Sequence, residues 1–288
     1  MNFLLFFKRL FHSLFYRLWS LSCSPSSNLF FLFFTRLLLP SSVKLVYDSI
    51  FDVYLISELT PSGDPITIAV DLSLSRRIQR YFGGLLQQIN YVGESYCIEA
   101  LSFSESPTII DCGANLGEFF LYLCLKNISC RYIAFEPGIA EINSLRITFL
   151  LSRQFGFNPV LETFALSDFI GFSKFYYSPI GADSSLFKPS QFSSSYDVEC
   201  ITIDHYLFVN DIKYVDLIKI EGEGFEPEIL SGASMSMANF LYITCDLGPE
   251  RGPKNDSPFI QVHNFLNQHG FKLLKFSPRR LCFLYIKS

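Results

Sequence analysis

The chain of 288 residues has few histidines and few charges, and each shortage excludes a class of protein. Only four histidines are present, which leaves little material for a histidine-built metal site. Charged residues make up 17% and hydrophobic residues 49%, a composition that excludes an intrinsically disordered chain. The net charge of −4 does not indicate a nucleic-acid-binding protein. The composition therefore favours one globular domain, with or without an appendage.

The eight cysteines contain no CxxC pair, which excludes a zinc ribbon and a thioredoxin-like redox motif. Several of them lie in apolar stretches such as LYLCLK and RLCFLYI. We expect reduced, buried thiols in a cytoplasmic protein.

Acidic residues are absent before Asp48, whereas five lysines and arginines occur in the same stretch. The stretch lacks the run of about 20 apolar residues that a membrane-spanning helix needs. Its charges follow the first apolar run instead of preceding it, unlike those of a signal peptide. Apolar residues at helical spacing predict a basic amphipathic helix that ends near the Ser/Pro cluster at 22–28; a second apolar segment then runs from Leu29 to Leu39.

Two interpretations of residues 1–47 remain open. The helix lies on an anionic membrane surface, or it forms a helical layer packed on the main domain or on a second subunit. Residues 48–107 connect this extension to the main domain, residues 108–288. The connection contains an alternating strand pattern, ITIAVDL, and a helical pattern broken at Gly83 and Gly84.

Residues 108–117, TIIDCGANLG, predict a strand, a glycine turn and the start of a helix. This is the opening unit of a doubly wound sheet, in which ligands bind at the carboxyl ends of the strands. The pattern D-x-G-x-N-x-G differs from the G-x-G-x-x-G of nicotinamide enzymes. Because Asp111 would repel a pyrophosphate, it suits a cationic ligand, such as the ammonium of a methionine moiety.

Two further strands end in acids. Glu136 follows Asp111 by 25 positions, near the spacing at which an acid accepts from ribose hydroxyls, and Pro137 opens the next helix. A third strand, Val160–Ser167, ends at Asp168, which would face the base of a nucleoside. A solvated turn acid is the alternative for Asp168, and a solvated strand-end acid is the alternative for Glu136.

The stretch 215–224, VDLIKIEGEG, predicts a strand with an ammonium and two carboxylates at its end. Adjacent acids raise the pKa of a lysine, so Lys219 is a poor base and acts as an electrostatic organiser. We expect Glu221 or Glu223 to accept a proton from the substrate. A purely structural Lys–Glu network is the alternative, and Asp246 and Glu250 add acids to the same edge.

Together these motifs resemble the FkbM family of S-adenosylmethionine-dependent methyltransferases over about residues 108–285. The motifs are IIDCGANLGEF (109–119), AFEPG (134–138), ALSD (165–168), TID (202–204) and IKIEGEGFEPEILSGA (218–233). The resemblance implies an α/β class I methyltransferase fold, a Rossmann-like seven-stranded sheet with helices on both faces and its last strand antiparallel. It also implies S-adenosylmethionine as the cofactor.

Carried over by position, the resemblance implies three groups of site residues. The glycine loop supplies cofactor contacts from Asp111, Gly113, Ala114, Asn115 and Gly117. Glu136 and Pro137 lie at the ribose and Asp168 near the adenine. Lys219, Glu221 and Glu223 match the K-x-D-x-E-G signature of the catalytic edge. The chain departs from this signature because the family usually has Asp at 221 and a β-branched apolar residue at 222.

The resemblance further implies in-line methyl transfer, usually to a hydroxyl of a sugar or natural product, assisted by a carboxylate. We expect a small-molecule or glycan acceptor, no nucleic acid and a cytoplasmic protein, for which peripheral membrane contact through residues 1–39 is one of the two open interpretations. No metal ligand is assigned, although the acids at 221, 223 and 246 permit Mg²⁺. The alternative is a non-catalytic cofactor-binding or membrane-associated protein that retains the fold. Tyr176, Tyr177 and Phe187 could stack on a sugar ring or form the core of an inserted hairpin.

Overall fold

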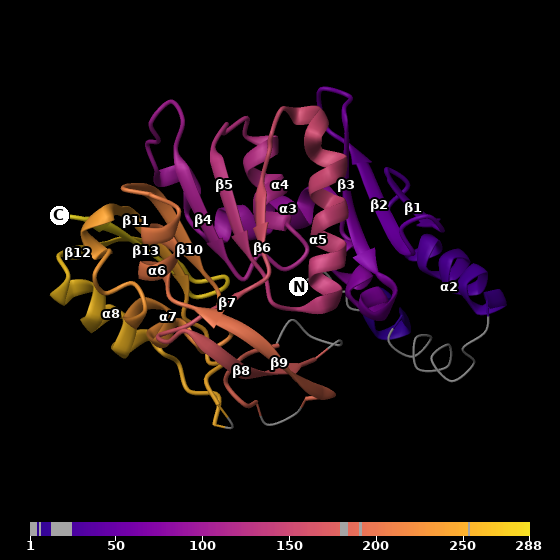
Figure 1. Ribbon diagram of the computed structural model, residues 1–288. Coiled ribbons are helices and arrows are strands. Elements are labelled where there is room, and N and C mark those ends of the chain that lie inside the picture. The colour runs from indigo at the N-terminus through magenta and orange to yellow at the C-terminus, as the bar shows by residue number, and fades with distance from the viewer. Residues whose placement is uncertain (1–4, 6, 13–24, 179–183, 190–191, 253) are drawn as a thin grey trace.

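A seven-stranded sheet forms the centre of the computed structural model, which describes residues 5, 7–12, 25–178, 184–189, 192–252 and 254–288 (Figure 1). Its strands are β4 (Thr108–Cys112), β5 (Arg131–Phe135), β6 (Val160–Glu162), β10 (Val215–Ile220), β11 (Phe240–Asp246), β12 (Phe271–Ser277) and β13 (Cys282–Lys287). They lie in the order β12-β13-β11-β10-β4-β5-β6. The last strand of the chain, β13, is antiparallel to both of its neighbours, as expected.

Helices cover both faces of this sheet, because its central strands are apolar on both sides. Ile109 of β4 belongs to a core shared with α3 (Leu85–Ser95), α4 (Glu118–Leu125) and α5 (Ile139–Leu151). The next residue, Ile110, belongs to the opposite core, shared with α6 (Ile203–Val209), α7 (Glu226–Ser231) and α8 (Phe259–Gln268).

A smaller antiparallel sheet precedes the central one and consists of β1 (Val43–Asp48), β2 (Val53–Leu59) and β3 (Pro65–Asp71). Helix α5 lies between the two sheets (Figure 1). Hydroxyls of α5 cover the free edge of β3: Thr148 accepts from the Ala69 amide at 3.0 Å, and Ser144 accepts from the Asp71 amide at 2.9 Å. These hydrogen bonds join the small sheet to the helix layer of the central sheet that contains α5.

The connection from β3 to β4 is helical, as its pattern predicts. The 3-10 helix η1 (Leu72–Tyr81) follows β3 directly, α3 begins after the Gly83–Gly84 break, and a 3-10 turn, η2 (Ile98–Ala100), leads to β4. Gly93 of α3 lies against the Tyr122 ring of α4, where a built Cβ would come within 2.0 Å. This close contact brings α3 to the edge of the sheet at which the site lies.

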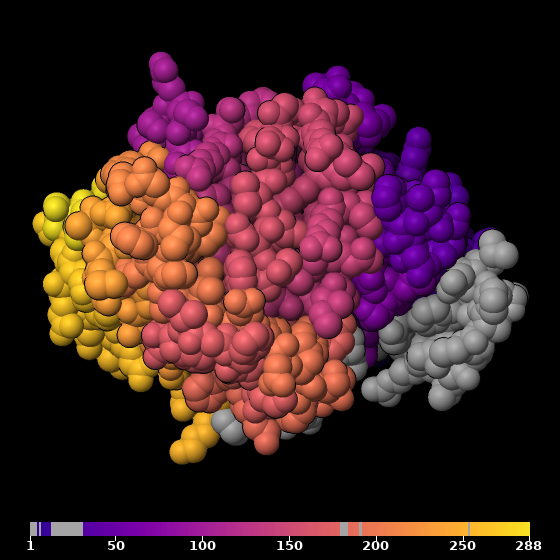
Figure 2. Space-filling view, in the orientation of Figure 1, coloured from indigo at the N-terminus to yellow at the C-terminus, as the bar shows by residue number. Residues whose placement is uncertain are grey.

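The N-terminal segment is helical where it is described. Residues 7–12 are α-helical, and α2 (Pro25–Leu38) starts four residues earlier than the expected apolar segment and packs on β1. The expected helix end near 22–28 lies partly outside the described residues. In the space-filling view the indigo residues, which include those of the small sheet β1–β3, form one flank of the molecule (Figure 2). Among the described helices, none is long and apolar enough to cross a bilayer.

The third strand expected at 160–167 is wrong as a single element. The chain forms β6 up to Glu162 and then β7 (Ala165–Leu166), which leaves the central sheet and pairs in parallel with β9 (Ser194–Ile201). Strand β8 (Gly171–Tyr177) completes this separate three-stranded sheet. The division occurs because β9 offers a second hydrogen-bonding partner beyond Glu162, which an apolar pattern alone does not reveal.

Candidate functional site

The loops after β4 and β10 meet backbone to backbone at the carboxyl edge of the central sheet. Gly113 has a positive φ of 76°, and a Cβ built there would lie 2.1 Å from the carbonyl oxygen of Glu221. The amides of Gly113 and Ala114 both donate to the Phe135 carbonyl, at 3.0 and 3.1 Å. Only glycine satisfies both the conformation and the contact at 113, so this residue sets how closely the two loops approach.

A buried cation lies beneath these loops. Lys219 is 2% exposed, and its Nζ lies 2.8 Å from Asp111 Oδ1, 3.0 Å from Glu221 Oε2 and 2.8 Å from the Gly113 carbonyl. Burial alone would lower the pKa of Lys219, but the charges of Asp111 and Glu221 outweigh it and raise that pKa. Lys219 therefore stays an ammonium and holds the surrounding acceptors in place. The rise of its pKa is in the direction that the sequence predicts.

Asp111 lies elsewhere than the sequence-based interpretation placed it. Its carboxylate is fully buried, lines neither of the cavities at this edge, and accepts from the Tyr132 hydroxyl. Burial raises the pKa of Asp111, while Lys219 opposes that rise. Asp111 does pair with an ammonium, but the ammonium belongs to Lys219, its direct register partner on the neighbouring strand β10.

Three groups of the protein contact the carboxylate of Glu221. Besides Lys219, it accepts from Tyr96 Oη at 2.6 Å and pairs with Arg280, which also lies 3.1 Å from Asp246 Oδ2. Burial would raise the pKa of Glu221, but Arg280 and Lys219 outweigh it and hold that pKa well below the usual value. A carboxylate held so firmly in its ionised form is a poor proton acceptor.

Glu136 accepts from two backbone amides, Asn115 N and Gly138 N, each at 2.8 Å. A Cβ built on Gly138 would lie 2.4 Å from Glu141 Oε2 and 2.9 Å from Glu136 Oε1, so both carboxylates border one small space. Burial and the charge of Glu141 raise the pKa of Glu136 to about 8. The two carboxyl groups thus form a pair, one on the loop after β5 and one in the first turn of α5.

Arg77 holds the second member of this pair. Its Nη2 lies 2.6 Å from Glu141 Oε1 and 3.2 Å from the Ser178 carbonyl, and its Nη1 donates to Asn115 Oδ1 at 3.1 Å. The other oxygen, Glu141 Oε2, is buried without a hydrogen-bond partner. A buried acceptor of this kind costs stability unless a ligand satisfies it, so Glu141 presents an open acceptor to the cavity that it lines.

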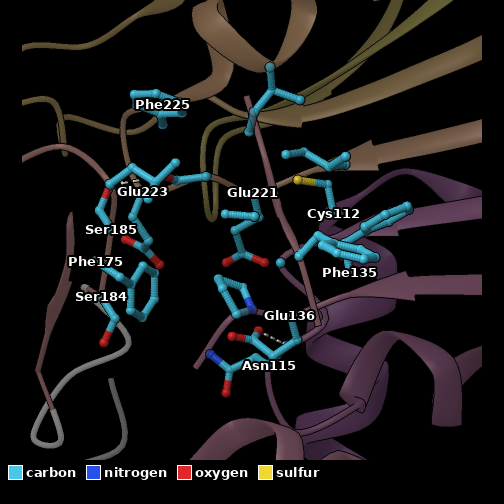
Figure 3. Close-up of a pocket in the computed structure, with 18 of the residues that line it drawn as sticks. Cys112, Asn115, Phe135, Glu136, Phe175, Ser184, Ser185, Glu221, Glu223 and Phe225 are labelled. Atoms are coloured by element: carbon cyan, nitrogen blue, oxygen red, sulfur yellow. Dashed lines mark hydrogen bonds between the residues drawn. The ribbon is translucent and has the colours of Figure 1, made fainter. Parts of the chain in front are cut away.

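Two cavities meet at this edge. The first, about 70 Å³, has apolar walls from Phe135, Pro137 and residues 164–166, with Glu136 and Glu141 at one side and Phe175 and residues 184–186 opposite. Figure 3 shows Glu221 and Glu136 pointing toward its middle, with Glu223 on the same loop as Glu221.

The second cavity is larger, about 700 Å³, and more polar. The two cavities share four lining residues: Gly113, Asn115, Glu221 and Glu223.

The loop that carries Glu223 is clamped from both sides. Glu226 Oε1 accepts from the amides of Gly222 and Gly224 at 2.8 and 3.2 Å, and Arg251 donates to the Gly224 carbonyl at 2.6 Å. Glu223 itself adopts a positive φ of 52° between the two glycines. The neighbours therefore hold Glu223 at the junction of the cavities through the backbone.

Gly222 departs from the family pattern for a structural reason. A Cβ at this position would lie 2.8 Å from the Cδ1 atom of Ile229, so the Ile229 side chain occupies the space that a branched residue at 222 would fill.

The remaining predicted site residues are distributed unevenly. Ala114 lines the second cavity and Pro137 the first. Gly117 lines neither; it starts α4 with a φ of 96°, where a Cβ would lie 2.9 Å from Leu145. Asp168 is exposed and lines neither cavity, because the chain has left the central sheet before it reaches this residue.

The three aromatic residues considered for sugar stacking also line neither cavity. Phe187 packs under the Arg251 guanidinium at 4.6 Å, Tyr176 meets Phe192, and Tyr177 packs near Tyr196. Their contacts are those of an inserted hairpin.

Several site residues escaped the sequence analysis. Tyr96, Arg280, Arg77 and Glu141 come from segments without a recognisable motif. The one signal in the sequence for these residues was the position of Glu141, an acid in the first turn of a helix. Within the described residues, no group of three or more histidine, cysteine or acidic side chains forms a metal site.

The order and direction of the strands define the class I methyltransferase fold, with the ligand edge at the carboxyl ends of β4, β5 and β10. A scan of protein families matches residues 111–273 to the Methyltransferase FkbM domain. The chain therefore belongs to the FkbM methyltransferase domain family, and S-adenosylmethionine is the cofactor that this membership implies. A comparison with curated protein sequences finds no significant match.

Solved structures with similar folds include an FkbM methyltransferase from Methylobacillus flagellatus, at 16% identity and a TM-score of 0.47. The match covers 75% of this chain and 55% of that one, so this chain spans little more than half of its length. A magnesium protoporphyrin IX methyltransferase from Synechocystis, solved with bound S-adenosylmethionine, matches at 10% identity and a TM-score of 0.41. That match covers 75% of this chain and 84% of the other.

The residues of the site fit the implied cofactor. Glu136 and the open Oε2 of Glu141 provide acceptors for hydroxyl donors, and Gly138 leaves the space between them unfilled. The apolar walls of the first cavity suit a base, and the glycine loop lets the backbone approach closely.

Proposed function

We propose that this protein transfers the methyl group of S-adenosylmethionine to a hydroxyl oxygen of a sugar or natural-product acceptor. The observation that carries the proposal is the meeting of an apolar, carboxylate-bearing cavity with a larger polar one at Glu221 and Glu223. A transferase needs its two substrates in contact at one point, and binding them in adjoining cavities supplies the required proximity.

The first cavity suits the adenosine part of the cofactor. Its apolar residues Phe135, Phe164 and Leu166 can enclose a flat base, while Glu136 accepts from ribose hydroxyls. Adenosine needs more room than about 70 Å³. We therefore expect residues 184–186, which close the cavity opposite Glu136, to shift when the cofactor binds.

The second cavity suits a polyhydroxylated acceptor. Its volume of about 700 Å³ falls within the range of small-molecule sites, and Gln87, Gln88, Tyr91 and Glu118 offer donors and acceptors for hydroxyl groups. These four residues alternate with apolar ones such as Val92 and Phe119. That mixture suits a sugar ring, which has both polar edges and apolar faces.

The charged residues at the junction divide the chemical work. When bound, S-adenosylmethionine supplies a methyl group activated by a positively charged sulfur. Glu221 and Glu223 both line the two cavities, but Lys219 and Arg280 hold Glu221 in its ionised form. We therefore assign the proton of the acceptor hydroxyl to Glu223. Lys219 keeps Glu221 and the Gly113 carbonyl in place and does not exchange a proton.

The division of the chain fits this proposal. We assign methyl transfer to residues 108–288, and we assign acceptor recognition in large part to residues 1–47 and 48–107. Leu5 and Arg9 from the first segment and Arg80, Gln87 and Gln88 from the second line the acceptor cavity. The seven described cysteines are free thiols, which supports a reducing, cytoplasmic compartment.

Calorimetric titration of S-adenosylmethionine into the full chain tests the first half of the proposal. We expect micromolar binding that Glu136→Ala weakens at least tenfold. Incubation with a panel of glycans, polyketide alcohols and lipid-linked sugars, read as S-adenosylhomocysteine release, tests the second half. A folded protein that does not bind the cofactor would support the non-catalytic alternative instead.

A further inference from the structure

The first helix has its apolar side turned outward. Phe7, Leu10 and Phe11 follow the i, i+3, i+4 spacing of one helical stripe and are 49%, 47% and 51% exposed. On the other side of the helix, His12 is fully buried, and Leu5 and Arg9 line the acceptor cavity. A surface helix normally buries its apolar stripe, so the exposure of Leu10 and Phe11 leaves an apolar surface that a partner can cover.

Helix α2 repeats this arrangement. Phe31, Thr35 and Leu39 are buried against the domain, whereas Phe33 and Leu37 are 61% and 64% exposed on the other side. Together, Phe7, Leu10, Phe11, Phe33 and Leu37 are called the N-terminal apolar residues below.

The charge around these residues is of one sign. The chain has no acidic residue before Asp48, and Lys8, Arg9, Arg36 and Lys44 are distributed through the described part of this stretch. Arg36 lies between Phe33 and Leu37 on the exposed side of α2, and it is itself exposed. The rest of the molecule is acidic overall, because the chain as a whole carries a net charge of −4.

We infer that the N-terminal apolar residues and the basic residues among them dock on an anionic lipid surface, and that the acceptor cavity receives a hydroxyl carried by a membrane lipid. Exposed aromatic and aliphatic side chains enter the acyl boundary, while Lys and Arg contact anionic headgroups. A protein partner would not require a stretch of 47 residues without one carboxylate.

The position of the cavity links the two parts of this inference. One face of the first helix lines the acceptor cavity through Leu5 and Arg9, and the other face exposes Leu10 and Phe11. Docking of the outer face therefore places the rim of the cavity at the level of the headgroups. The lipid-borne acceptor rests on the proposed methyl transfer, whereas the docking itself does not.

Sedimentation of the full chain with vesicles tests the docking. Phosphatidylcholine vesicles that contain phosphatidylglycerol should bind the protein. Vesicles without this anionic lipid should bind it weakly, and added salt should weaken binding to the anionic vesicles. Leu10→Ser with Phe11→Ser should weaken binding about 100-fold, since two apolar side chains no longer enter the bilayer. Phe33→Ser with Leu37→Ser should weaken it similarly.

A matched control uses two apolar residues that are at least as exposed but lie elsewhere. Phe208→Ser with Met235→Ser removes side chains that are 81% and 85% exposed and should leave vesicle binding unchanged. Equal binding by the wild type and the Leu10/Phe11 variant would overturn the inference. So would absence of vesicle binding together with a dimer that the same variant dissociates, because the surface would then be a subunit contact.

Cofactor titration separates this inference from the proposed function. The Leu10/Phe11 variant should bind S-adenosylmethionine as tightly as the wild type while losing its methyl transfer to acceptors embedded in vesicles. Vesicle binding without cofactor binding would refute the methyl transfer and leave the docking intact. The lipid-borne acceptor would be refuted if both proteins bind the cofactor and the wild type and the variant methylate soluble and vesicle-embedded acceptors equally well.

Discussion

The two cavities that meet at Glu221 draw their walls from different parts of the chain. The first takes all of its residues from 112–229, within the segment that matches the FkbM domain. The second takes nine of its 19 lining residues from 5–92, and these and Arg280 lie outside that segment. The shared fold thus builds the whole of the first cavity and about half of the second.

The comparison explains why the acceptor is harder to assign than the cofactor. Cofactor residues follow strand ends, whose positions the sheet dictates, so that a motif locates them. Acceptor residues such as Gln87 and Tyr91 lie on α3, whose position depends on packing against α4. Substitutions in the first cavity should therefore change cofactor affinity, and substitutions in the second should change the KM of the acceptor. Substitutions in the buried network around Lys219 should affect both.

Removing the ammonium between the two cavities should have the largest effect. Lys219→Met leaves Asp111 and Glu221 with one cation fewer in a buried site, so we expect a loss of about 4 kcal/mol in the free energy of unfolding. Lys213→Met is the matched control, because its pair with Asp211 is largely exposed and should contribute below about 0.5 kcal/mol. Denaturant unfolding measures both, and equal losses would show that the Lys219 network does not hold the edge together.

The residue shared by both cavities should decide turnover. Glu223→Gln removes the proposed proton acceptor and should lower kcat by about 100-fold with little change in the dissociation constant of S-adenosylmethionine. Glu250→Gln is the comparison, because Glu250 lines only the second cavity. A larger loss of kcat for Glu250→Gln than for Glu223→Gln would move the proton-accepting role to Glu250. That result would be compatible with its pKa, which burial in the cavity wall and the charges of Asp246 and Glu221 raise.

One substitution on each side sharpens the division. Glu141→Gln alters the open acceptor of the first cavity and should weaken cofactor binding about tenfold, with the acceptor KM unchanged. Gln87→Ala in the second cavity should raise the acceptor KM and leave cofactor binding unchanged. Titration calorimetry and steady-state kinetics on both variants check this. A cofactor effect from Gln87→Ala would mean that the two cavities act as one.

The smallest expected effect is a pH dependence confined to the first cavity. The pKa of Glu136 is raised to about 8, so its carboxyl gains charge as the pH rises from 7 to 9. The ionised form accepts more strongly from ribose hydroxyls, and affinity for methylthioadenosine should increase about fivefold over this range. Methylthioadenosine lacks the α-amino group of the methionine moiety, which would itself titrate in this range. Glu136→Gln should bind with an affinity independent of pH; a persisting pH dependence would assign the titration to another group.

The acids at the site show how far a local pattern can be interpreted. The sequence predicted a cationic ligand at Asp111, whereas the cation beside Asp111 in the structure is Lys219; the raised pKa of Lys219 was predicted correctly. The partner of Asp111 was wrong, because a strand-end acid pairs with whatever cation the neighbouring strand presents, and here the register places Lys219 beside it. Glu221 and Glu223 looked equivalent in sequence, and only the contacts of Tyr96 and Arg280 separate them.

The sequence by itself determined the glycine loop after β4 and the acid after β5, because these depend on local backbone requirements and on hydrophobic periodicity, and its family resemblance implied the seven-stranded sheet with an antiparallel last strand. The tertiary structure decided that Tyr96, Lys219 and Arg280 hold Glu221, that Asp168 lies away from both cavities, and that the described N-terminal helices expose apolar side chains. Each of these depends on contacts between segments far apart in the chain. The energy of a charge or an apolar surface is set by its surroundings in space, which no local spacing encodes.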